Sequence, residues 1–195
     1  RYVAFDSCVT NWAVVWGKTL AVHDIFVHDR ELFVTEWVNP PTQSSPGGFN
    51  NHHSGDASIS ADGRYVAFGS QATTQPQTLG HFGSSQIYVR DTCRGAPGAC
   101  QEATEWASPQ AHVDFQPSDT FKPSLSADGR FVAYEARSTV LVPGDTNEAT
   151  DIFVFDRQAQ AVTRVNVSSA GGQAMTTQPT TCSGSLHASI SGNGR

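Results

Sequence analysis

Oxygen-bearing side chains are concentrated in one short segment, residues 143–151, with the sequence P-G-D-T-N-E-A-T-D. Asp145, Asn147 and Asp151 can each present an oxygen atom, and their spacing resembles loops in which alternate side chains turn towards Ca²⁺. The segment lacks the full calcium-loop pattern, and an Asx-type turn that leads into a strand is the other interpretation. Calcium is therefore the one cofactor that the sequence suggests.

Two of the four cysteines, Cys93 and Cys100, enclose the loop C-R-G-A-P-G-A-C between two strand-like segments. A hairpin can hold their Cα atoms at the separation that a disulfide needs, whereas the spacing fits no zinc pattern. We expect a Cys93–Cys100 disulfide and hence an oxidising compartment, extracellular or periplasmic. Free thiols in a cytosolic loop are the alternative.

Signatures of enzymes are missing from the sequence. It contains no nucleophile elbow, P-loop or H-E-x-x-H segment. Several carboxylates could form the pair that glycoside hydrolysis needs, but spacing along the chain does not predict their separation in space. They are Glu36, Glu102, Glu105 and Glu135. The adjacent His52 and His53 point apart in an extended chain, so a metal site there needs a distant ligand and a solvated loop is favoured.

Tryptophans suggest contact surfaces. Trp12 and Trp16 lie in the run W-A-V-V-W, which is unusually apolar for a loop and indicates an interface. Trp37 and Trp106 recur at matching places in the chain, where packing between neighbouring units is the favoured interpretation.

The strongest signal is an internal repeat. The segment A-S-I-S-A-D-G-R-Y-V-A-F (57–68) returns as P-S-L-S-A-D-G-R-F-V-A-Y (123–134). The chain opens on the second half of this motif and closes on the first half. The equivalent arginines, Arg1, Arg64, Arg130 and Arg195, are 63, 66 and 65 residues apart.

Two further markers follow in each unit. An apolar run of the Ile-Phe-Val type ends at Asp29, Asp91 and Asp156. Because these aspartates recur once per unit, we interpret them as structural turn contacts rather than catalytic groups. Later come V-T-E-W (34–37), A-T-E-W (103–106) and V-T-R-V (162–165).

Each unit predicts four strands. Asp-Gly at 62–63 and 128–129, and Asn-Gly at 193–194, supply the positive φ angles of tight hairpin turns. The inner strands are apolar on both faces, as expected where sheets stack on each other. Such units are typical of β-propeller blades, so the sequence predicts an all-β propeller fold with three blade equivalents. Residues 1–63, 64–129 and 130–195 form the three repeat units of one propeller, each ending in the first strand of the next blade.

The repeat resembles the TolB-like, WD-related β-propeller repeats of exported bacterial proteins. The residues that carry the resemblance are P-S-L-S-A-D-G-R-F-V-A-Y, L-V-P-G-D-T-N-E-A-T-D-I-F-V-F-D-R and T-R-V-N-V in the third unit. The resemblance covers essentially the whole chain. It implies a propeller, usually outside the cytoplasm, that binds proteins or other ligands, and it does not imply an enzyme.

The repeat is out of phase with the chain, which starts at strand two of one unit and stops after strand one of another. Propellers close with roughly four to eight blades, so three blades make no ring. We expect either a window on a longer repetitive chain or copies that complete one another's blades, since a bare inner edge leaves backbone groups unpaired. Ile190 lies on the spare strand and is a candidate interface residue. A Cys8–Cys182 disulfide could lock such a junction; two unrelated thiols are the alternative.

Composition limits the classes of function. The net charge of −6 argues against nucleic acid as a partner, and no apolar stretch is long enough to span a bilayer. The leading hypothesis is a secreted, non-catalytic scaffold or self-assembling building block, closed or fibrous, with other copies or neighbouring repeats as partners. A periplasmic or cell-surface propeller that binds a protein or glycan is the second hypothesis, and a propeller glycoside hydrolase is the third.

Overall fold

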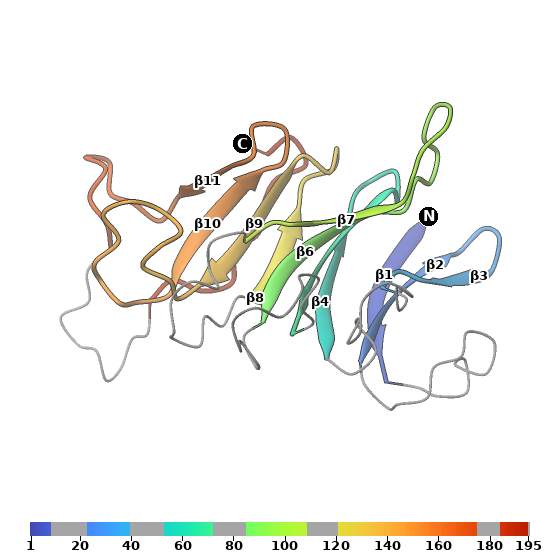
Figure 1. Cartoon of the computed structure of the whole chain (residues 1–195), viewed down its shortest axis with the longest axis horizontal. Helices are drawn as coiled ribbons and strands as arrows, with labels where there is room; N and C mark the ends of the chain where they lie inside the picture. The colour runs from blue at the N-terminus through green and yellow to red at the C-terminus, as the bar shows by residue number, and fades with distance from the viewer. Residues whose placement is uncertain (9–22, 40–52, 72–84, 109–120, 175–183, 195) are drawn as a thin grey trace.

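The regular elements of the described chain are all β-strands, arranged in three antiparallel sheets (Figure 1). The computed structural model describes residues 1–8, 23–39, 53–71, 85–108, 121–174 and 184–194. The strands are β1 (Tyr2–Ser7), β2 (Asp24–Asp29), β3 (Val34–Trp37), β4 (Ser54–Ile59), β5 (Tyr65–Ser70), β6 (Gln86–Asp91), β7 (Ala103–Trp106), β8 (Phe121–Leu125), β9 (Phe131–Ala136), β10 (Asp151–Asp156) and β11 (Ala161–Arg164). Within these ranges, no helix has the length and apolar character that crossing a membrane requires.

Each sheet is one blade of a β-propeller. The strand orders are β1-β2-β3, β4-β5-β6-β7 and β8-β9-β10-β11, so every strand pairs with its neighbour in the chain. We call these the first, second and third blades. The blades lie side by side in chain order, with their sheets facing one another (Figure 1). The predicted all-β propeller fold with three blade equivalents is therefore confirmed.

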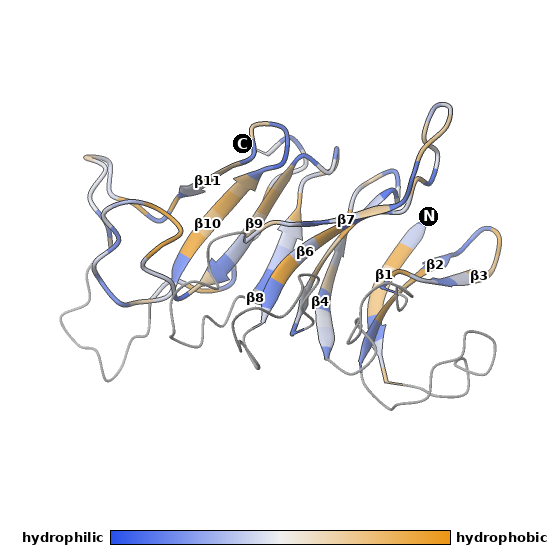
Figure 2. Ribbon diagram, viewed as in Figure 1, coloured by the Kyte–Doolittle hydropathy of each residue, from blue (hydrophilic) through white to orange (hydrophobic). Residues whose placement is uncertain are grey.

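The apolar core lies between the blades, not within them. One cluster joins Ile25 and Val27 of the first blade to Val66 and Phe68 of the second. A second cluster joins residues of the second and third blades, including Val89 and Tyr134. Because the second blade buries both of its faces, its inner strands are apolar at consecutive positions, as the colouring of β6 shows (Figure 2).

The Asp-Gly turns also hold neighbouring blades together. Gly63 and Gly129 have φ angles of 78° and 71°, which an L-residue with a side chain rarely adopts. The ring of Tyr2 lies where a Cβ atom of Gly63 would be, at 2.2 Å, and Tyr65 occupies the same place at Gly129. Glycine is therefore required at each turn for two reasons. It adopts the positive φ angle, and it leaves space for the tyrosine ring of the preceding blade.

The predicted position of the outer strand in the third blade is wrong by one residue. There, β10 pairs with β11 so that Asp156 faces Ala161, as Asp29 faces Val34 in the first blade. Both hairpins have four connecting residues, and turn length sets the register. The strand is therefore Ala161–Arg164 rather than the expected 162–165. Thr163, not Arg164, takes the position of the glutamate in T-E-W.

Candidate functional site

The segment Ser185–Gly194 contacts the third blade as an innermost strand would. The Ser185 N–H donates to the Thr150 carbonyl (2.7 Å), and the Ile190 N–H donates to Ser124 Oγ (3.1 Å). Equivalent bonds hold β4 against the first blade and β8 against the second. They run from Ser54 N to His23 O (2.9 Å) and from Leu125 N to Ser58 Oγ (3.0 Å).

The backbone of this segment also has the conformation of an innermost strand. His187 has a φ of 63°, matching Asp56 (56°) in β4 and Lys122 (51°) in β8 at the equivalent positions. In β4 and β8 this residue falls within a shift of register against the next strand, typical of a β-bulge. Ser185–Gly194 is therefore shaped to pair with a second strand of another blade.

Strand β1 forms the opposite half of such a pair. It is the inner edge strand of the first blade. The equivalent strands of the other two blades, β5 and β9, pair along this edge with β4 and β8. Val3 exposes 45% of its surface, whereas the equivalent Val66 and Val132 are fully buried. At the far end of the described chain, Val165 is 47% exposed, while the equivalent Val38 is 3% exposed. Both terminal faces thus expose apolar residues whose equivalents in the other blades are buried.

The recurrent aspartates form ion pairs within each blade, as their once-per-unit spacing predicted. Each accepts hydrogen bonds from the arginine that follows the Asp-Gly or equivalent position, with shortest contacts of 2.6–2.7 Å. The pairs are Arg1–Asp29, Arg64–Asp91 and Arg130–Asp156. The hydrogen bonds from Arg130 lower the pKa of Asp156 to about 2, and those from Arg64 hold the pKa of Asp91 below its ordinary value. These carboxylates are structural.

A second arginine clamps successive blades to each other. Arg94 of the second blade pairs with Glu36 of the first, donates to the Gly63 carbonyl (2.6 Å) and lies 4.8 Å from the centre of the Tyr2 ring. Its guanidinium thus combines an ion pair, a hydrogen bond and a cation–π contact at one junction. Arg157 of the third blade repeats these contacts, with Glu105, the Gly129 carbonyl and the Tyr65 ring.

The four carboxylates considered for hydrolysis all have structural partners. Glu36 and Glu105 belong to the clamps just described. Glu102 pairs with Arg90 at 2.5 Å, and Glu135 accepts a hydrogen bond from the His187 N–H. In the described ranges, each of these four side chains is therefore engaged in holding strands or blades together.

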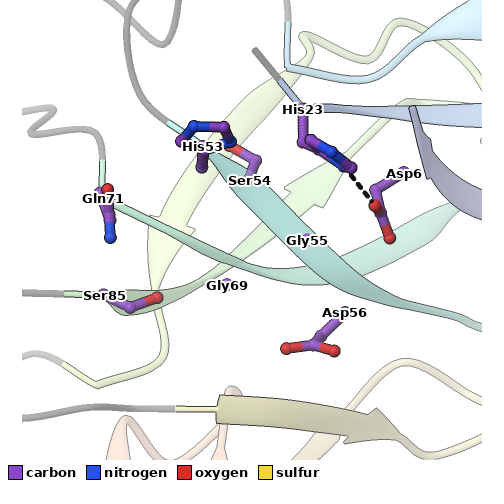
Figure 3. Close-up of a pocket in the computed structure, with 9 residues that line it drawn as sticks. All are labelled: Asp6, His23, His53, Ser54, Gly55, Asp56, Gly69, Gln71 and Ser85. Atoms are coloured by element: carbon purple, nitrogen blue, oxygen red, sulfur yellow. Dashed lines mark hydrogen bonds and ion pairs between the residues drawn. The ribbon is translucent and has the colours of Figure 1, made fainter. Parts of the chain in front are cut away.

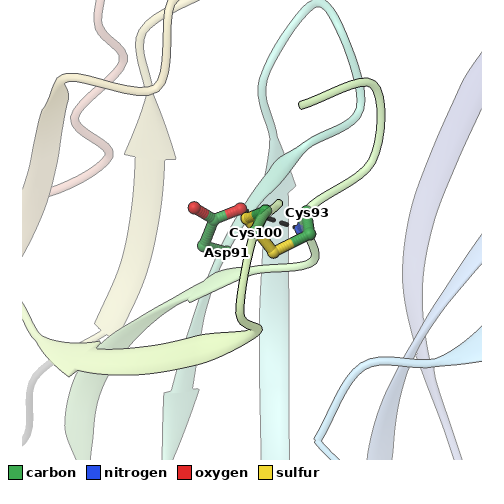
Figure 4. A group of neighbouring side chains, drawn as sticks. All are labelled: Asp91, Cys93 and Cys100. Carbon is green, nitrogen blue, oxygen red and sulfur yellow. Dashed lines mark hydrogen bonds between the residues drawn. A yellow bond between two sulfur atoms is a disulfide. The ribbon is translucent and has the colours of Figure 1, made fainter. Parts of the chain in front are cut away.

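Cys93 and Cys100 form the predicted disulfide, with Cα atoms 5.7 Å apart. Figure 4 shows the bond beside Asp91, whose Oδ1 accepts a hydrogen bond from the Cys93 N–H (2.8 Å). The three side chains are close enough to suggest a metal site. Because the two sulfur atoms are bonded to each other, they offer no thiolate ligand.

The structure leaves the suggested Cys8–Cys182 disulfide and the Trp12 and Trp16 interface untested. Cys8 is exposed and forms no disulfide in the described structure. Its suggested partner, Cys182, falls among the residues that are not described. The same holds for Trp12 and Trp16. The Cys8–Cys182 bond and the tryptophan interface stay predictions.

The residues suggested for calcium converge around an arginine. Arg164 Nη1 lies 3.1 Å from Asp145 Oδ1 and 3.4 Å from Asp151 Oδ2. The Ala149 N–H donates to Asn147 Oδ1 (3.0 Å), which is the Asx-type turn of the other interpretation. Burial raises the pKa of Asp145, the neighbouring Asp151 raises it further, and Arg164 opposes both effects. The guanidinium supplies the positive charge that an ion would bring, and calcium binding stays a prediction.

The two recurrent tryptophans have different surroundings. Trp106 packs against the core between the first and second blades, with its ring centre 6.3 Å from that of Tyr88. Trp37 donates from Nε1 to Asn39 Oδ1 (3.1 Å) and lines a cleft of about 310 Å³ with Arg90 and Arg94. Packing between blades thus accounts for Trp106, whereas Trp37 borders a cleft.

A polar pocket lies between the first and second blades, at the strand ends away from the Asp-Gly turns (Figure 3). Its volume is about 220 Å³, and Asp6, His23, His53 and Asp56 are among the residues that line it. His23 Nδ1 lies 2.8 Å from Asp6 Oδ2, and the rings of His23 and His53 have centres 5.6 Å apart. Sequence reasoning considered His53 but missed His23, because they are thirty positions apart and become neighbours only when two blades stack.

No protein-family model matches the sequence, and no curated protein matches it. In structure, the chain is similar to a TolB from Agrobacterium tumefaciens, with 17% identity and a TM-score of 0.45. That similarity covers 74% of this chain and 41% of the other. It is also similar to a prolyl endopeptidase, with 17% identity and a TM-score of 0.49, over 89% of this chain and 22% of the other. The chain spans less than half of either protein, and the TolB-like repeat family stays a prediction.

Proposed function

We propose that this chain is a secreted, non-catalytic β-propeller scaffold that assembles by blade completion between copies. The segment Ser185–Gly194 of one copy adds to β1 of a second copy as its innermost strand. The observation that carries the proposal is that this segment already has the contacts and the backbone conformation of β4 and β8. Strand addition of this kind gains main-chain hydrogen bonds along the whole edge.

The repeat predicts the register of the new pair. In the second blade, Ser54 faces Ser70 and Ile59 faces Val66. The equivalent partners across the junction are Ser185 with Ser7 and Ile190 with Val3. Strand addition would also stack the exposed face of the third blade on that of the first, so that Val165 and Val3 are both buried. Burial of apolar surface of this kind is the main driving force of association.

Secretion is supported by the Cys93–Cys100 bond, since structural disulfides persist in oxidising compartments. The disulfide closes the long connection between β6 and β7, at the rim where blades meet. We therefore place the assembled scaffold outside the cytoplasm, either at the cell surface or in the periplasm.

Single substitutions on the two halves of the junction test the proposal. Val3→Asp and Ile190→Asp should each weaken self-association of the chain by at least about tenfold, because a carboxylate would be buried without a partner. Leu32→Asp is the matched control, since Leu32 is an exposed apolar residue in the β2–β3 turn. Sedimentation velocity over a range of concentrations measures the effect. A wild-type chain that stays monomeric at high micromolar concentration, or a loss of association in Leu32→Asp as well, would contradict blade completion.

A binding function is the second candidate, and the cleft beside Trp37 favours it. The cleft combines an indole ring with the charged side chains of Arg90, Arg94 and Glu102. Aromatic and charged groups side by side suit a glycan or a peptide. If the cleft binds glycans, the wild-type chain should bind to a glycan array, and Trp37→Ala should abolish this binding while leaving assembly intact. If the chain serves only in assembly, neither the wild-type chain nor the variant should bind to the array.

A further inference from the structure

The stacking of the first blade on the second places two histidines side by side. His23 immediately precedes β2, and His53 immediately precedes β4. The Ser54 N–H donates to the His23 carbonyl (2.9 Å), and the Gln71 N–H donates to the His53 carbonyl (3.1 Å). These backbone bonds hold both residues at the mouth of the polar pocket, with their rings tilted by 43° (Figure 3).

A carboxylate fixes the state of one of the two rings. Asp6 Oδ2 lies 2.8 Å from His23 Nδ1, and because an ionised carboxylate only accepts hydrogen bonds, Nδ1 must carry the proton. The Nε2 atom of His23 then keeps its lone pair in the neutral ring. A histidine whose Nδ1–H donates to a carboxylate is the usual arrangement behind a metal-ligating Nε2.

The separation of the rings suits a shared ion. Two imidazole nitrogens at about 2.1 Å from a tetrahedral metal have ring centres roughly 5 Å apart, and the observed separation is 5.6 Å. His53 is exposed, so a small rotation of its side chain can direct a nitrogen at the same point as His23. Asp56 lines the same pocket, but its carboxylate does not converge with the two histidines in the described structure, so water would complete the coordination.

The repeat provides an internal comparison for this pocket. In the third blade, the residues equivalent to His23 and His53 are Thr150 and Gly184, which form the same backbone contact as an isolated bridge. The residue equivalent to Asp6 is Gly69 in the second blade and Glu135 in the third, where the carboxylate accepts a hydrogen bond from the His187 N–H. The fold therefore does not need histidines at these two positions, since Thr150 and Gly184 form the same backbone contact.

We propose that His23 and His53 bind a divalent transition-metal ion of the zinc class, with Asp6 as the positioning residue for His23. Imidazole ligands favour such ions over calcium or magnesium. The site lies at the strand ends between two blades, so a bound ion would fasten the first blade to the second. The inference does not require blade completion, because both histidines belong to one copy, although Asp6 lies on β1, the strand that the proposed junction also uses.

Zinc titration of the whole chain by calorimetry tests the site. It is best done in the Val3→Asp background, so that self-association does not contribute to the heat. His23→Ala and His53→Ala should each weaken zinc binding by at least tenfold, and Asp6→Asn should weaken it by about tenfold, the usual effect of losing an outer-shell partner. His28→Ala is the control, because His28 lies on β2 and bonds to Thr35 Oγ1 instead.

A second readout separates binding from loss of structure. Excess zinc should raise the melting temperature of the parent chain and of His28→Ala, and it should leave that of His53→Ala unchanged, since only a ligand of the folded state stabilises it. His53 is exposed, so its truncation should not unfold the chain. Equal zinc affinity in the parent chain and in the His23→Ala/His53→Ala double variant would overturn the proposal.

Discussion

Single side chains can be compared with their counterparts in the other blades. Tyr134, Phe68 and Phe5 occupy the same position on the second strand of their blades. Tyr134 is fully buried, and no described residue forms a hydrogen bond with its hydroxyl group. Burial raises the pKa of this hydroxyl, since the charged form would lose its solvation. The oxygen atom is therefore a cost to stability that the second blade avoids with phenylalanine.

We predict that Tyr134→Phe increases the free energy of unfolding by about 1 kcal/mol, because a buried polar group without a partner is removed and the ring is kept. The reciprocal change, Phe68→Tyr, should lower it by about 1–3 kcal/mol. Urea denaturation in the Val3→Asp background measures both values without a contribution from assembly. Identical stability of Tyr134→Phe and its parent would mean that the hydroxyl is satisfied, for example by water.

At the scale of the elements, the Asp-Gly turn joins blades as well as strands. The turn between β8 and β9 brings Gly129 against Tyr65 of the second blade, and the Arg157 guanidinium lies 4.1 Å from the centre of the same ring. Turn, ring and guanidinium recur at the junction of the first and second blades. Each junction therefore depends on a residue that cannot have a side chain.

Gly129→Ala should lower the free energy of unfolding by about 3 kcal/mol. The new methyl group would overlap the Tyr65 ring and would also impose a positive φ on alanine. Gly95→Ala isolates the second effect, because Gly95 has a φ of 69° with no atom within 4 Å of the added carbon. It should cost about 1 kcal/mol. Equal losses in the two variants, measured by thermal or urea denaturation, would show that the contact with Tyr65 has no energetic role.

At the scale of the whole molecule, the two exposed ends of the row of blades differ in kind. One end offers the acceptor edge β1 and the other offers the donor segment Ser185–Gly194, so the proposed contact between copies would be head-to-tail. Two copies would supply six blades and could close into a ring. If the rotation between copies does not close, the same contact propagates as a fibre.

Mixing two defective variants tests this head-to-tail arrangement. Val3→Asp keeps the donor segment Ser185–Gly194 intact, and Ile190→Asp keeps the acceptor edge β1 intact. The equimolar mixture should form one heterodimer through the single functional junction, detectable by native mass spectrometry after differential isotope labelling. Neither variant alone should dimerise. Homodimers of either variant, or no heterodimer, would rule out strand donation from the C-terminal segment to β1.

The sequence by itself determined the features that depend on neighbours along the chain. Tight turns follow from Asp-Gly, blade strands from the repeated apolar runs, and the Cys93–Cys100 bond from two cysteines that flank one short loop. Strand order follows as well, because within each blade the strands pair in chain order. These features are local, so residue type and spacing suffice to predict them.

Only the tertiary structure decided what faces what across the blades. The shared pocket of His23 and His53 and the contact of Arg94 with Glu36 join residues thirty or more positions apart. Such contacts depend on how far one sheet slides over the next, which no local pattern encodes. The register of β11 was misjudged for a related reason, because turn length and not the matching letters Val-Thr sets the pairing. These contacts form at the blade junctions, where side chains from distant segments of the chain meet.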